Sequence, residues 1–110
     1  MLDIHKREVG TVSVLSLNGE LDLDGAQNLK VCLTCLFQEA TKKVIIDWTD
    51  VDRINFASLQ MVTRPMKDLL ANGPMAFCGM SDAVKKSLKT VPFFDKIKEF
   101  DSEDRALTRL

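Results

Sequence analysis

The chain has 110 residues, of which 45% are hydrophobic and 28% charged, and its formal net charge is -1. Its lysines and arginines are scattered, which argues against a surface that follows nucleic-acid phosphates. No apolar run approaches the roughly 20 residues of a membrane span, and the N-terminus lacks the apolar segment of a signal peptide. We therefore expect one domain over residues 1–110, located in the cytoplasm, with no nucleic-acid partner and no direct membrane insertion.

The first part of the chain has the pattern of two strands followed by a helix. Strands are predicted over residues 2–9 and 12–17, and Asn18-Gly19 supplies a turn signal after the second. A helix is predicted from about residue 25 to 40, where Asp22 or Asp24 can act as the N-cap. Its expected buried stripe consists of Ala26, Leu29, Leu33, Leu36, Phe37 and Ala40.

The central part begins with the short β-branched run Val44-Ile45-Ile46, which is typical of a strand buried on both faces. Residues 47–53 are expected to form a polar connection, and Asn55 can cap a helix over residues 56–71. The apolar face of this helix is predicted to contain Phe56, Leu59, Val62, Thr63, Met66, Leu69 and Leu70. Because the first amides of a helix are unpaired, the junction before it is a natural place for function.

Pro65 falls inside this second helix, where it removes a backbone donor and costs about 3 kcal/mol. We expect a kink between Met61 and Pro65 that faces solvent. Ala57, Met61 and Arg64 should share the outward side of the helix.

The C-terminal part continues the alternation of strands and helices. A strand is predicted over 75–80, followed by a helix that Ser81 caps and that buries Val84, Leu88 and Val91. A short strand is predicted over 98–100 and a last helix from 103 to about 110. The predicted fold is therefore an α/β domain, with a mixed, mostly parallel sheet of about five strands and about four helices on one side. The residues expected to be buried are Val44, Ile46, Leu59, Val62, Leu29, Leu33 and Leu36.

The three cysteines do not have the pattern of a disulfide framework, because their number is odd. Cys32 and Cys35 form a C-x-x-C, but the pair lies in the middle of a predicted helix, and the only histidine, His5, is remote in sequence. We expect reduced thiols and no metal, with Cys32 at the edge of the core, Cys35 exposed and Cys78 buried.

Catalysis is not expected. The chain has one histidine and no tyrosine, and it lacks a nucleophile elbow, a glycine-rich phosphate loop and a pair of carboxylates in an apolar context. We therefore predict a non-enzymatic domain without a cofactor.

The segment V-I-I-D-W-T-x-V-x-x-I-N-F-A-S-L, residues 44–59, resembles the STAS domain family of sulfate transporters and anti-sigma factor antagonists. The family pattern is an apolar strand ending in Asp-Leu-Ser, followed after a gap by Asp-Ser-Ser-Gly-Leu. Asn55 stands where the family has Asp, and Phe56 where it has the phosphorylatable Ser. Ala57 and Ser58 replace a Ser (or Ala) and a Gly.

The resemblance extends to Gly19-Glu20-Leu21-Asp22, followed by Ala26, and covers nearly the whole chain. In antagonists with the phosphorylation switch, the Asp that matches Asp22 lies beside the phosphorylated serine. The resemblance implies a STAS-like fold and a regulator that binds an anti-sigma factor or another ATPase-fold protein through residues 55–66. The implied partner-binding residues are Asp22, Asp24, Asn55, Phe56, Ala57, Ser58, Met61 and Arg64.

Phe56 has no hydroxyl, so we expect no phosphorylation at the family position, and Ser58 is a secondary candidate acceptor. Phe56 itself either anchors a partner or fills the core. Two other uses of the domain stay open, a cytoplasmic subunit of an ABC-type lipid transporter and a scaffold subunit of a signalling assembly. The sequence is also compatible with a homodimer.

Overall fold

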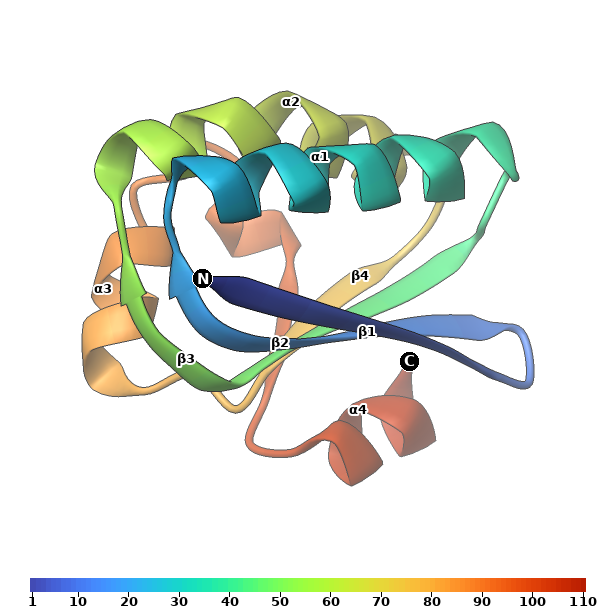
Figure 1. The fold of residues 1–110 in the computed structure, drawn as a ribbon. Helices are drawn as coiled ribbons and strands as arrows, with labels where there is room; N and C mark the ends of the chain where they lie inside the picture. Colours follow the sequence, from blue (N-terminus) through green and yellow to red (C-terminus); the bar gives the residue numbers. More distant parts are fainter.

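A computed structural model describes all 110 residues as one five-stranded sheet with helices on both faces (Figure 1). The strands are β1 (Leu2–Val9), β2 (Val12–Leu21), β3 (Lys43–Ile54), β4 (Met75–Cys78) and β5 (Lys98–Phe100). The helices are α1 (Leu23–Gln38), α2 (Phe56–Asn72), α3 (Asp82–Leu88) and α4 (Glu103–Arg109), with a 3-10 turn at Phe94–Lys96. None of these helices has the length and apolar character needed to cross a bilayer.

The strands follow one another in the order β1-β2-β3-β4-β5. β1 is antiparallel to β2, and every other neighbouring pair is parallel, which confirms the expected mixed, mostly parallel sheet. β3 lies in the centre, and Val44, Ile45 and Ile46 are each at most 2% exposed. Val44 and Ile46 join the larger core with α1, α2 and α3, whereas Ile45 joins a smaller core on the other face.

The prediction that all helices lie on one side of the sheet is wrong. α1 and α2 lie side by side over one face, and α4 lies against the opposite face (Figure 1). α4 packs there through Ala106, which is fully buried beside Val14 and Cys78. One small buried residue in a seven-residue helix is too weak a periodic signal to indicate which face the helix covers.

β2 and β3 continue well beyond their predicted ends. The segment 47–53, expected as a polar connection, is part of β3, and β2 runs to Leu21. Their pairing contains two register shifts, between Ser16 and Asn18 and between Gly19 and Glu20. Such irregularities break the simple two-residue alternation that identifies a strand in a sequence, although Trp48 and Val51 are both buried.

α1 begins at Leu23, two residues before the predicted start, and ends at Gln38. Leu29, Leu33 and Leu36 are fully buried, as predicted. Phe37 and Ala40 are exposed instead of buried: Phe37 lies in the last turn of α1, and Ala40 lies past the end of the helix with a φ of 57°.

α2 runs unbroken from Phe56 to Asn72, and Pro65 is buried rather than solvent-facing. The spacing explains this result: Ser58, Val62, Pro65 and Leu69 recur at intervals of three and four residues, and all are buried. The ring therefore lies on the inward stripe of the helix. Leu59 and Val62 are buried as predicted, but Phe56 lies outside the core.

β4 ends at Cys78 because Gly79 turns the chain with a φ of +68°. A Cβ atom at this position would overlap the Thr49 side chain, whose hydroxyl donates a hydrogen bond to Asp47 Oδ1. Gly10 has a similar φ of +63°, but no atom lies within 4 Å of its virtual Cβ.

These two glycines form a matched pair for a stability measurement. We expect Gly79→Ala to lower the free energy of unfolding by about 3 kcal/mol, since left-handed strain and overlap with Thr49 both contribute. Gly10→Ala should lower the free energy of unfolding by only about 1 kcal/mol, because the left-handed backbone strain is the single contribution there. Urea denaturation of both variants measures the difference, and equal losses would show that the contact between Gly79 and Thr49 has no energetic importance.

Candidate functional site

The carboxyl ends of β2 and β3 place the starts of α1 and α2 side by side. Leu21 and Ile54 are in register at the ends of these two parallel strands. The Asn55 amide then donates a hydrogen bond of 3.0 Å to the Leu21 carbonyl. Both helices therefore begin at the same edge of the sheet, where α/β folds commonly bind ligands. The sequence-predicted residues Asp22 and Asn55 come together at this edge.

Asp22 is the N-cap of α1. Its Oδ1 accepts a hydrogen bond of 2.7 Å from the Gly25 amide, and its other carboxylate oxygen lies 3.6 Å from the N-terminal amine of Met1. The Gly25 hydrogen bond, reinforced by that amine, holds the pKa of the Asp22 carboxyl below its usual value. Asp24 lies in the first turn of α1 and is exposed. A cap role for Asp22 is therefore established, and a role in binding stays a prediction.

Asn55 caps α2 in the same manner, with two hydrogen bonds to one residue. Its Oδ1 accepts from the Ser58 amide at 3.0 Å and from the Ser58 hydroxyl at 3.2 Å. Ser58 is 0% exposed. Its hydroxyl thus belongs to the cap, and a kinase could reach it only if the first turn of α2 opened.

The outer surface of the same turn has a different character. Phe56 is 62% exposed and Ala57 is exposed beside it, so the interpretation of Phe56 as a core residue is wrong. Farther along α2, Met61 is half-buried, and the Arg64 guanidinium is exposed and lies 3.1 Å from the Asp68 carboxylate. Phe56, Ala57, Met61 and Arg64 thus lie on α2 outside its set of buried residues, although Met61 also packs against the larger core, and they do not form an enclosed pocket.

A hollow beside Phe56 was not predicted from the sequence. It has a volume of about 260 Å³ and is lined by Ile54, Phe56, Leu59, Lys86, Ser87 and Thr90. Lys86 and Ser87 belong to α3, and Thr90 lies two residues past its end. The spacing of Lys86, Ser87 and Thr90 places them on one side of a helical turn, but only the tertiary packing brings them to α2.

The start of α2 combines an exposed aromatic ring with a helix end that no acidic side chain compensates. α2 has no acidic residue in its first turn, whereas α1, α3 and α4 each have at least one. An exposed aromatic ring next to a positively polarised helix end can bind an apolar and acidic surface. No group of three or more His, Cys, Asp or Glu side chains is placed to hold a metal ion.

The cap of α2 gives a test of local stability. Asn55→Ala should lower the free energy of unfolding by about 1–3 kcal/mol, because the buried amide and hydroxyl of Ser58 lose their acceptor. Asn55→Asp keeps the acceptor and adds charge at the positive end of the helix, so stability should be unchanged or higher by about 0.5 kcal/mol at pH 7. Denaturant unfolding distinguishes the two variants. A similar loss in both would contradict the cap assignment.

Comparison with known proteins identifies the family. The model of the STAS domain family matches residues 3–106. A search of curated protein sequences finds no match. Among solved structures, the unphosphorylated anti-sigma factor antagonist SpoIIAA has a TM-score of 0.80 at 18% identity, covering 97% of this chain and 95% of that chain. An anti-sigma factor antagonist from Mycobacterium paratuberculosis has a TM-score of 0.84 at 18% identity, with coverages of 98% and 92%.

A sulfate transporter family protein from Wolinella succinogenes also has a similar fold, with a TM-score of 0.76 at 21% identity and coverages of 94% and 87%. At these identities the structural likeness establishes the fold. The family model spans nearly the whole chain, from β1 into α4. This chain therefore belongs to the STAS domain family.

Proposed function

We propose that this STAS domain is a non-catalytic regulator that binds an ATPase-fold anti-sigma factor through the start and outer face of α2. The observation that carries the proposal is the exposed Phe56, which is 62% accessible at the first position of α2. Leaving a phenyl ring in water is unfavourable, and burial of such a ring in an interface contributes strongly to affinity. The similar folds of two anti-sigma factor antagonists support the class of partner.

The same position argues that binding is not switched off by phosphorylation. A family serine at this place would be modified at the helix start, where phosphate is favoured by the dipole. Phe56 offers no hydroxyl, and the hydroxyl of Ser58 is buried in the α2 cap. We infer that the domain is held in its binding-competent form and that control over the partner comes from elsewhere.

A second function would use the same surface. The fold of a sulfate transporter family protein is similar to this one, so the fold also occurs in proteins of transport. In that alternative, the domain is a cytoplasmic subunit that holds the ATPase of an ABC-type lipid transporter. Purification of the untagged protein from its own cells, followed by titration with each purified candidate ATPase, distinguishes the two functions. The preferred proposal expects saturable binding to a kinase-like anti-sigma factor and none to the transporter ATPase.

The anchor role of Phe56 predicts that Phe56→Glu weakens binding to the purified partner at least about tenfold, or 1.4 kcal/mol. The melting temperature should stay nearly unchanged, because the ring is already exposed. Val31→Glu is the matched control: Val31 is 54% exposed on α1, and the substitution introduces the same charge. Isothermal titration calorimetry measures both variants. Unchanged affinity in Phe56→Glu would overturn the anchor role.

The absence of a switch gives a separate prediction. Incubation of the wild-type protein with the partner and Mg-ATP should leave no phosphate on the peptide that contains residues 55–64. Phe56→Ser supplies a hydroxyl at the helix start and tests whether the partner is a competent kinase toward this position. Peptide mass spectrometry provides the readout. Phosphorylated Ser58 in the wild-type protein would contradict the proposal of a fixed state.

A further inference from the structure

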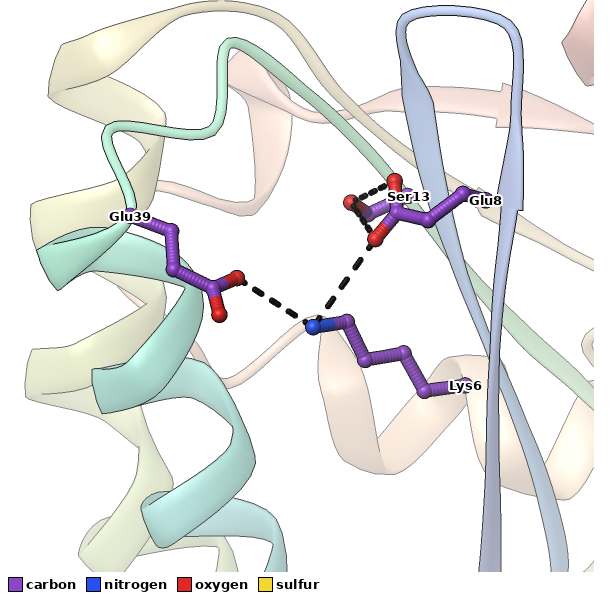
Figure 2. A network of polar contacts seen from close by, with 4 residues as sticks. All are labelled: Lys6, Glu8, Ser13 and Glu39. Carbon is purple, nitrogen blue, oxygen red and sulfur yellow. Dashed lines mark hydrogen bonds and ion pairs between the residues drawn. The ribbon is translucent and has the colours of Figure 1, made fainter.

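Away from the α2 surface, α1 and β1 are connected by a network of polar contacts. The Lys6 ammonium lies 3.2 Å from Glu39 Oε1, just past the end of α1, and 3.8 Å from Glu8 Oε1 on its own strand (Figure 2). The Glu8 carboxylate also accepts from the Ser13 hydroxyl at 3.0 and 2.9 Å, and Ser13 is only 2% exposed. The hydrogen bond to Glu39 raises the pKa of Lys6, so a fixed positive charge lies beside the last turns of α1.

Cys32 and Cys35 lie in these last turns of α1, near enough to Lys6 for its charge to act on the Cys32 thiol. They are separated by three residues on a helix, which places them on the same side with Cα atoms about 5 Å apart. Disulfides span Cα separations of this size, but their Cβ atoms are about 3.5–4.5 Å apart, closer than the roughly 5–6 Å of such a helical pair, so a bond requires the last turns of α1 to tighten. The structure agrees with the expected burial of all three thiols: Cys35 is exposed, Cys32 is half-buried and Cys78 is buried.

The two thiols of the pair differ in the way that a two-step exchange reaction requires. Cys35 is exposed and therefore accessible to a small molecule. Burial raises the pKa of the Cys32 thiol, the neighbouring Cys35 raises it further, and the Lys6 charge lowers it. Cys35 also lies in the final turn of α1, because its carbonyl accepts the hydrogen bond from the Glu39 amide that closes the helix. Helix ends tighten and fray more readily than helix centres, so the two sulfurs can approach there.

We propose that Cys35 is a site of reversible thiol modification by low-molecular-weight disulfides, with Cys32 as its resolving partner. The Cys35 thiolate attacks one sulfur of the small disulfide, forming a mixed disulfide and releasing one small thiolate. The Cys32 thiolate then attacks the Cys35 sulfur of the mixed disulfide and releases the second small thiolate. The protein loses two protons and two electrons and gains a Cys32–Cys35 disulfide, and the oxidant is reduced to two small thiols.

The pair lies far from any helix N-terminus, but the Lys6 ammonium beside it can attract an anionic small disulfide such as oxidised glutathione. Once Cys35 carries the mixed disulfide, Cys32 lies one helical turn away, and its attack is intramolecular, so a raised pKa does not prevent the second step. Cys78 provides an internal comparison, since burial raises the pKa of its thiol to about 12.

The test uses the full chain, fully reduced and without a tag, treated with oxidised glutathione and followed by intact-mass spectrometry. The wild-type protein should lose about 2 Da and retain no glutathione. Cys32→Ser should trap a stable adduct of about 305 Da, and Cys35→Ser should react at least about a hundredfold more slowly than Cys32→Ser. Peptide mapping should find the disulfide within one chain.

A charge-matched pair of variants tests the role of Lys6. Lys6→Gln should slow formation of the adduct in the Cys32→Ser background about threefold, because the positive charge that attracts the anionic oxidised glutathione is removed. Lys30→Gln removes an exposed lysine of α1 that has no ion pair, and should leave the rate unchanged. The proposal is overturned by a stable glutathione adduct on the wild-type protein, a disulfide between chains, reaction of Cys78 at a similar rate, or no oxidation at all.

Discussion

The structure depends on the burial of β3 on both faces. Val44, Ile45 and Ile46 have no access to water, so their backbone groups must be paired on both sides, and the strand must lie between β2 and β4. Alternation of side chains then creates two cores, one for each face of the sheet. This requirement accounts for the position of α4, because Ile45 would face water without a helix on that side. It also directs the carboxyl ends of β2 and β3 to one edge.

At that edge, one helical turn contains both the residues of the α2 cap and the residues that we propose contact a partner. The buried Ser58 donates hydrogen bonds from its amide and its hydroxyl to Asn55 Oδ1, and this pair defines where α2 begins. Phe56 and Ala57, which lie between them, face outward. A helix turn repeats every 3.6 residues, so positions i and i+3 share a side while the two positions between them point elsewhere. The surface chemistry of this turn can therefore change without loss of the cap.

The elements with a regular apolar period were predictable from the sequence. The centre of β3, the buried leucines of α1 and the cap of α2 at Asn55 follow from local patterns alone. The ends of β2 and β3 were not predictable, because register shifts and polar residues on the open side of the strand hide the alternation. The hollow at Phe56 requires Lys86 to approach from α3, which is a tertiary contact with no local signature. Pro65 shares the buried stripe of Val62 and Leu69, so its spacing indicates its position better than the general preference of proline for a solvent-facing kink.

The outermost strand, β1, has consequences for how copies of this protein meet one another at high concentration. Its free side exposes unpaired amides and carbonyls that could extend the sheet into another molecule. Three consecutive charged residues, Lys6, Arg7 and Glu8, oppose such growth. Lys6 forms an ion pair with Glu39 above the sheet, and Arg7 forms one with Glu103 of α4 below it, so the strand is tethered from both faces. Strand exchange between molecules would have to break both ion pairs, which disfavours aggregation through β1.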